Sequence, residues 1–343
     1  IGLGIPAEPL FRSDSVYVTG FFNMRGNVKM IKTKSAAQSA PRSKLARAAN
    51  QMWRDKILYL LLLPTLTYFI IFRVWPMFNM RLAFYDYKAR GPWVFAGMKY
   101  FQMLFKTPAF GEILKNTLIL SFMKYVLLFP AFVIFALVLN ELKVQKFRKY
   151  VQVVSYLPHF LSWVVIAGIW KSFLAPGEDS AINMIIGLFG ADAVDLLTDK
   201  GAIRWVLFFC EAWRSLGWDS IVFYTAIIGI SADIYEAAAL DGANRKDVIL
   251  HIILPELLIP MTTVFILNLG FFMSAGFDQV YNFTNASVNS VIDILDTYVN
   301  RIGIENGQYS LGTAVSLIKG VVGLILVYMT HISSKRLTGE GVW

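Results

Sequence analysis

The sequence has little cysteine, histidine or charge, and it lacks the short motifs of common catalytic sites. A single cysteine among 343 residues excludes an internal disulfide framework and a Cys-based metal site. Cys210 stands in an apolar run, which favours an inert buried thiol. His159, His251 and His331 are too scattered for an H-E-x-x-H zinc site. Neither G-x-S-x-G nor the phosphate loop G-x-x-x-x-G-K-[ST] occurs, so we expect no enzymatic centre, no metal and no cofactor bound by this chain.

The scarcity of charge places the chain in a bilayer. Charged residues make up 16% of the sequence and hydrophobic residues 56%, with a mean hydropathy of +0.55. Soluble domains carry about a quarter charged residues. Only helices can cross lipid as an open chain, because lipid offers the backbone no hydrogen-bond partners. We therefore predict an all-α integral membrane protein with six transmembrane helices, at about 57–77, 118–139, 154–174, 203–230, 257–277 and 311–332.

The distribution of lysine and arginine predicts the orientation of these spans. With the N-terminus inside, the inner segments hold 18 such residues and the outer segments 8. Basic residues concentrate on the cytoplasmic side of membrane proteins. Both termini and the segment 231–256 are therefore predicted to be cytoplasmic. The net charge of +9 is therefore explained by the basic residues that set the orientation in the membrane, and it does not indicate nucleic-acid binding.

The two ends of the chain are predicted to flank a transmembrane domain at 57–335. Residues 1–56 form a basic tail, and residues 336–343 a short C-terminal tail. The first residue is Ile1, so we interpret residues 1–23 as sequence ahead of a natural start at Met24 or Met30. From Pro41 onward the pattern fits a basic amphipathic helix on the inner membrane surface, with a solvated basic tail as the alternative.

The outer segment 175–200 is acidic around an apolar stretch, 182–189, which predicts a short surface helix. The acids could bind a cation or contact a partner protein. Their spacing matches no calcium loop, so a solvated acidic loop is the simpler interpretation.

Ionisable side chains inside the predicted spans are costly and therefore informative. Glu211 and Arg214 are three residues apart on one helix and are predicted to pair. Asp219 could face Lys124 or Lys319 across the bundle, or line the transport route. Both lysines lack an acid on their own helix, so either they attract solute carboxylates or they pair with another helix.

Aromatic and amide side chains in the spans could contact a sugar. Trp218, Tyr224 and Phe272 could stack on sugar rings, although most aromatic residues of membrane proteins belong to the core or to interfacial belts. Asn268 is a candidate hydroxyl partner, because a mid-helix amide needs one. Four prolines within or near spans permit bends, namely Pro64, Pro130, Pro158 and Pro260.

The segment 231–257, SADIYEAAALDGANRKDVILHIILPEL, joins the fourth and fifth predicted spans. Ser231 or Asp233 can cap a short helix that Gly242 ends, and Asn244 can cap a second one that Pro255 stops. The small side chains of the first helix leave a smooth surface that could lie in a groove of another protein. An ordinary loop between membrane helices is the alternative.

This segment resembles the EAA signature of the permeases of binding-protein-dependent ABC importers. The matching positions include Glu236, Ala237, Ala238, Gly242 and Pro255, and Asp241 beside them is a further candidate for ATPase coupling. Four further stretches, 116–124, 156–163, 274–279 and 296–310, are similar to the sugar-importer branch of the maltose-permease type. Within that branch they are most similar to the subgroup for complex or acidic oligosaccharides such as alginate and rhamnogalacturonan.

The resemblance implies a type I importer permease with the MetI-like fold in the bacterial inner membrane. Its expected partners are a second, homologous permease, two cytoplasmic ATPase subunits that bind ATP and magnesium, and an extracytoplasmic solute-binding protein. The EAA helix is expected to dock on an ATPase subunit. A permease for neutral sugars and, from another class, an ion-coupled secondary transporter remain the alternative functions.

Overall fold

The computed structural model describes residue 51 and residues 53–338, without the side chains of residues 334 and 336–338. The basic amphipathic helix predicted from Pro41 and both chain ends lie almost entirely outside these residues. Contacts divide the chain into two units, Ile1–Phe72 and Arg73–Trp343. In the first unit, α2 (Lys56–Phe69) is an apolar helix that contains Pro64 and has no buried residue.

The second unit is almost entirely helical, as predicted. Apart from loops, the described residues of this unit also contain a hairpin of two-residue strands, β1 (Tyr85–Asp86) and β2 (Val94–Phe95), with Tyr85 opposite Phe95. The hairpin is preceded by η1 (Ile70–Val74, which begins in the first unit), α3 (Trp75–Met77) and η2 (Phe78–Phe84). It is followed by α4 (Lys99–Lys106), α5 (Pro108–Phe122), η3 (Met123–Leu127) and α6 (Phe129–Glu141). The middle of the chain forms α7 (Gln145–Tyr156), η4 (Leu157–Phe160), α8 (Trp163–Phe173), α9 (Ala181–Leu188) and α10 (Ile203–Ile228).

The remaining elements complete the bundle and its loops. They are α11 (Ala232–Leu240), α12 (Arg245–Val248), η5 (Ile249–Ile253), α13 (Leu254–Leu269), α14 (Phe277–Phe283), α15 (Asn289–Ile292), α16 (Leu295–Val299), η6 (Asn300–Glu305) and α17 (Tyr309–Thr338). The predicted surface helix at 182–189 is confirmed by α9, which Ser180 caps through the amide of Asn183.

Within the described part of the chain, four helical stretches are long and apolar enough to cross a membrane, and there are six if each of two bent pairs counts as one span. The predicted span at 118–139 begins earlier, since α5, η3 and α6 run continuously over Pro108–Glu141. The π-helical turn η3 ends just before Pro130, which therefore occupies the first turn of α6, where a missing N–H costs little. The predicted span at 257–277 is shifted, because its helix covers Arg245–Leu269 and Phe277 begins α14.

The prediction of one span at 154–174 is wrong in detail. The chain bends by 107° between Gln145–Phe160 and Trp163–Phe173. Pro158 lies in the 3₁₀ turn η4 at this break, and Ser162 caps the new helix α8 through the amide of Val165. A proline followed by an N-cap restarts the helix in a new direction.

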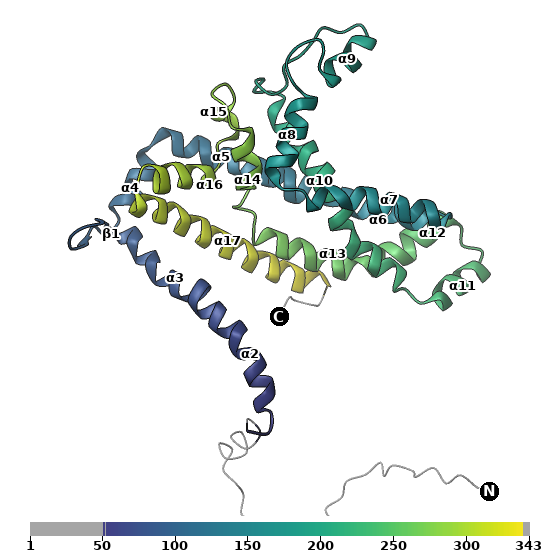
Figure 1. The fold of residues 1–343 in the computed structure, drawn as a ribbon. Coiled ribbons are helices and arrows are strands. Elements are labelled where there is room, and N and C mark those ends of the chain that lie inside the picture. Colours follow the sequence, from purple (N-terminus) through teal and green to yellow (C-terminus); the bar gives the residue numbers. More distant parts are fainter. Residues whose placement is uncertain (1–50, 52, 339–343) are drawn as a thin grey trace, which may run out of the picture. The chain divides into compact units, whose positions relative to one another are not determined.

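Helix α10 is the central element of the second unit. It packs along α6 and α7, and α17 packs along α13 (Figure 1). Gly217 permits the close approach of α7, because a Cβ at this position would lie 2.4 Å from the carbonyl oxygen of Ser155. Cys210, on the same helix, is fully buried as predicted.

Candidate functional site

The loop between α10 and α13 is built from local hydrogen bonds. Ser231 Oγ accepts from the amide of Asp233 at 3.3 Å and caps α11. The helix ends at Leu240, two residues before Gly242, whose φ of +77° lies in the left-handed region that favours glycine. Both features agree with the sequence prediction. The three residues that fill the EAA signature on α11 face solvent or are half-buried, and Leu240 at its end is 90% exposed.

The second half of the loop is tied to the end of α6. Asn244 caps α12 by accepting from the amides of Lys246 and Asp247, and the Asp247 carboxylate accepts from the Asn244 amide in return. Arg245 Nε lies 2.5 Å from Glu141 Oε2 at the end of α6. The loop is therefore braced on the bundle.

The prediction that Pro255 stops the second helix is wrong. Helix α12 continues through the π-helical turn η5 into α13, and Pro255 occupies the first turn of α13. The wider π turn shifts the pattern of backbone hydrogen bonds just before the proline. The N–H that Pro255 lacks therefore does not break the helix. One continuous helix thus connects the loop to the predicted fifth span.

Inside the bundle, Glu211 pairs with a lysine from another helix. Lys124 Nζ, on η3, lies 3.1 Å from Glu211 Oε2, and Ser215 Oγ donates to Oε1 at 2.9 Å. The prediction of a Glu211–Arg214 pair is therefore wrong, because in the described chain Glu211 forms its ion pair with Lys124 and none with Arg214. Arg214 instead stacks on Trp163, with Cζ 5.0 Å from the ring centroid.

Lys319 is likewise held by an acid from another element. Its Nζ donates to Asp296 Oδ1 on α16. Of the two interpretations left open for Lys124 and Lys319, the structure shows pairing between elements. Lys319 also lines a cavity of about 490 Å³ between α13 and α17, together with Ser274 and Ser316.

Tyr125 lies near both lysine pairs. Its hydroxyl donates to the carbonyl of Ser274 at 3.0 Å, and its ring lies 6.4 Å from that of Phe272. The same hydroxyl lies within electrostatic reach of Glu211 and Asp296. We refer to Lys124, Tyr125, Glu211, Asp296 and Lys319 as the polar centre.

The other predicted path residues differ in position. Asp219 also lies within electrostatic reach of Tyr125, but among the described residues it forms an ion pair with neither lysine. Trp218 stacks on His159, with ring centroids 4.4 Å apart and planes 6° apart. Tyr224 packs on the α6–α10 core, away from the polar centre, and Asn268 on α13 is half-buried.

A second polar network, which sequence reasoning missed, holds the segment 285–305 against the bundle. Arg204 Nη2 donates to Asn116 Oδ1 at 2.7 Å, and the Asn116 amide donates to the carbonyls of Ser290 and Asp293. Arg301 pairs with Asp293 at 2.5 Å, and this carboxylate raises the pKa of the Arg301 guanidinium. Partners up to 177 residues apart leave no local sequence signal.

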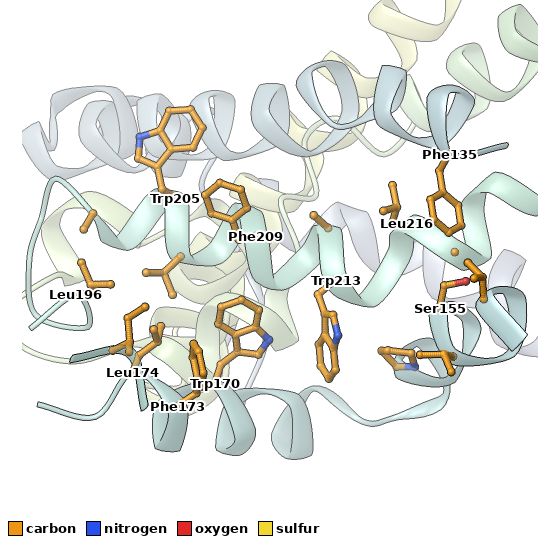
Figure 2. A pocket seen from close by; sticks show the side chains of 18 of the residues that line it. Phe135, Ser155, Trp170, Phe173, Leu174, Leu196, Trp205, Phe209, Trp213 and Leu216 are labelled. Carbon is orange, nitrogen blue, oxygen red and sulfur yellow. The ribbon is translucent and has the colours of Figure 1, made fainter. Parts of the chain in front are cut away.

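One apolar cavity is poorly suited to a sugar. It measures about 780 Å³ and lies between α10 and the bent pair α7–α8 (Figure 2). Aromatic and aliphatic side chains line it, among them Trp170, Trp205 and Trp213. The Ser155 hydroxyl in this lining already donates to the carbonyl of Gln152. Sugar hydroxyls would lose hydrogen bonds to water there with little replacement.

Residues 110–339 match a known family, described as "Binding-protein-dependent transport system inner membrane component". The chain is 38% identical over 295 residues to Protein LplB of Bacillus subtilis, covering 84% of this chain and 92% of that one. It is 36% identical over 307 residues to the polygalacturonan/rhamnogalacturonan transport system permease protein YteP of the same organism, covering 88% and 95%.

A solved structure gives the same fold. The permease chain belongs to a bacterial alginate ABC transporter in complex with an alginate pentasaccharide-bound periplasmic protein. It matches with a TM-score of 0.80 and 33% identity, over 85% of this chain and 99% of that one. The chain thus belongs to the family of binding-protein-dependent transport system inner membrane components. It is an ABC importer permease with the MetI-like fold, which confirms the predicted fold class and family.

Proposed function

We propose that the chain is the permease subunit of an ATP-driven importer for acidic oligosaccharides of the pectin or alginate type. Its partners are a second, homologous permease, two cytoplasmic ATPase subunits that bind ATP and magnesium, and an extracytoplasmic solute-binding protein. The names of YteP and of the alginate transporter support the solute class. The excess of basic residues in the proposed inner segments supports a cytoplasmic position of both termini and of the loop 231–256.

The proposed role in coupling ATP hydrolysis to transport rests on the loop 231–256, which is exposed and also fixed to the bundle. Glu236 and Asp241 are exposed at α11, and neither forms an ion pair within the described chain. Helix α11 follows α10 directly, whereas Arg245 and the helix that continues into α13 fix the other end. A push on α11 by a closing ATPase dimer is therefore transmitted to α10 and α13 as rigid elements.

The cavity beside Lys319 is the proposed point of contact with the solute. It offers an ammonium group and the Ser274 and Ser316 side chains in one place. A solute carboxylate can compete with Asp296 for Lys319, while sugar hydroxyls bond to the serines. Tyr125, which bonds to Ser274 of this cavity, also contacts Phe272 and Lys124.

Uptake by the reconstituted complex tests this assignment. Lys319→Ala is expected to reduce uptake of a uronate trimer roughly tenfold and to change uptake of its methyl ester much less. Lys335→Ala, an exposed lysine of the same helix α17, is the control and should change neither. Equal loss for both solutes would show that Lys319 is a structural lysine.

The same assay separates the alternative functions. Efficient uptake of neutral oligosaccharides with no preference for acids would assign the chain to neutral sugars. Uptake that continues without ATP and the ATPase subunits, driven by a proton or sodium gradient, would contradict the importer mechanism itself.

A further inference from the structure

Arg214 on α10 forms no ion pair with an acid among the described residues, although the Asp219 carboxylate lies within electrostatic reach of it. Its neighbour Glu211 is held by Lys124 and Ser215. The Arg214 guanidinium stacks on Trp163, and its Nε is buried without a hydrogen-bond partner in the described chain. An arginine within a span keeps its charge and normally faces a partner or a polar cavity.

Stacking on an indole suits a guanidinium that binds an anion at its edge. The ring attracts the cation through its face and holds its plane. It takes none of the N–H donors, which stay directed along the edge of the guanidinium. Two parallel N–H groups of arginine match the two oxygens of a carboxylate. Trp163 thus orients Arg214 while leaving its donors free.

A flat aromatic face lies one turn further along α10. Trp218 follows Arg214 by four residues, which is about 6 Å along the helix axis. His159 stacks on one face of Trp218 and fixes the ring, yet 39% of the Trp218 surface remains exposed. A sugar ring presents C–H groups on its face and, in a uronate, a carboxylate at its edge. This pair of side chains fits both features.

From this geometry we infer that Arg214 and Trp218 form a binding site for an acidic sugar residue, with Arg214 holding the carboxylate and Trp218 stacking on the ring. The inference rests on the proposed function and adds a contact separate from the Lys319 cavity. Lys124 and Lys319 already hold acids, so a solute must displace an acid there. At Arg214 it displaces none, which suits a first contact with an anionic solute.

The test uses the complete transporter in proteoliposomes, with trigalacturonate and trimannuronate as acidic probes and their methyl esters as neutral ones. Arg214→Gln is expected to raise the KM for the transported acid by roughly tenfold to a hundredfold. The ester should change less than threefold. Arg214→Lys keeps the charge but loses the paired donors, so it should show an intermediate loss. Trp218→Ala should raise the KM for acid and ester alike.

Each variant is compared with the wild type for the same probe. Any preference of the solute-binding protein for acid or ester therefore affects both transporters equally. Lys335→Gln is the charge-removing control. An equal change for acid and ester in Arg214→Gln, or no change for either, would overturn the inference while leaving the importer function intact. Wild-type transporter that imports the esters but neither acid would overturn the acidic-sugar assignment. Absence of ATP-dependent uptake of all four probes would contradict the proposed function and this site with it.

Discussion

The loop between α10 and α13 and the polar centre are organised in opposite ways. The loop owes its shape to hydrogen bonds between residues two or three positions apart, at Ser231 and Asn244. The polar centre joins groups that are far apart in sequence, such as Lys124 with Glu211 and Tyr125 with Ser274. A locally built helix can keep its shape while another protein moves it. A centre built from several helices must rearrange when those helices move.

The strongest test of this comparison perturbs the loop. Gly242→Pro is expected to reduce uptake by about a hundredfold or more, because proline cannot adopt φ of +77° and removes the amide that bonds to the Ala239 carbonyl. Membrane insertion should be unchanged. Uptake and copurification of the ATPase are the measurements.

Gly190→Pro provides a matched control outside the loop. Gly190 has φ of +76° and an amide that bonds to the Gly187 carbonyl, after α9. The local strain is the same, so a similar loss of uptake would show that strain, rather than the docking surface, explains the effect at Gly242.

The next largest effect is expected from the polar centre. Glu211→Gln leaves the largely buried ammonium of Lys124 without its acid and should lower the free energy of unfolding by about 3 kcal/mol. Lys124→Met combined with Glu211→Leu removes both charges and should cost clearly less. Unfolding in mixed micelles measures both. If the double variant is less stable than the single one, the ion pair does not explain the stability of this region.

The contact between α7 and α10 should respond to one methyl group. Gly217→Ala places a Cβ against the Ser155 carbonyl and should cost about 1–3 kcal/mol of unfolding free energy. Gly168→Ala, on α8 with no atom within 4 Å of the new Cβ, should be neutral or slightly stabilising. Similar destabilisation by both would indicate a general effect of helix glycines.

The smallest effect concerns the β1–β2 hairpin. The Tyr100 hydroxyl and the Lys99 ammonium bond to the Asp86 carboxylate and lower its pKa below the usual 3.8. The unfolded chain therefore takes up this proton at a higher pH than the folded chain. The stabilisation is complete above the ordinary pKa and is lost as pH falls through the lowered one.

Amide exchange of Ala96, which bonds to the Phe84 carbonyl, can report on this hairpin. The stability of the hairpin should be constant from about pH 5 to 8 and fall only below about pH 4. Asp86→Asn should remove this dependence. A change in hairpin stability near neutral pH would mean that another group controls it.

How far the sequence predicted the protein depends on the range of the interactions. The ends of α11 and the cap of α12 follow from Ser231, Gly242 and Asn244, whose effects reach only a few residues. The fate of Pro255 could not be predicted, because it depends on a π turn that no local residue pattern signals. The Glu211–Arg214 prediction was wrong because helical spacing cannot show that Lys124 is nearer.

The sequence by itself determined the membrane-spanning helical class, the family and the local form of the loop between α10 and α13. Apolar run length, charge scarcity and helix caps act within one segment and need no knowledge of the others. Only the tertiary structure decided which acid each buried lysine holds, which arginine keeps its donors free and where the third predicted span bends. Those outcomes depend on helix packing, since partners far apart in the chain meet only when the bundle has formed.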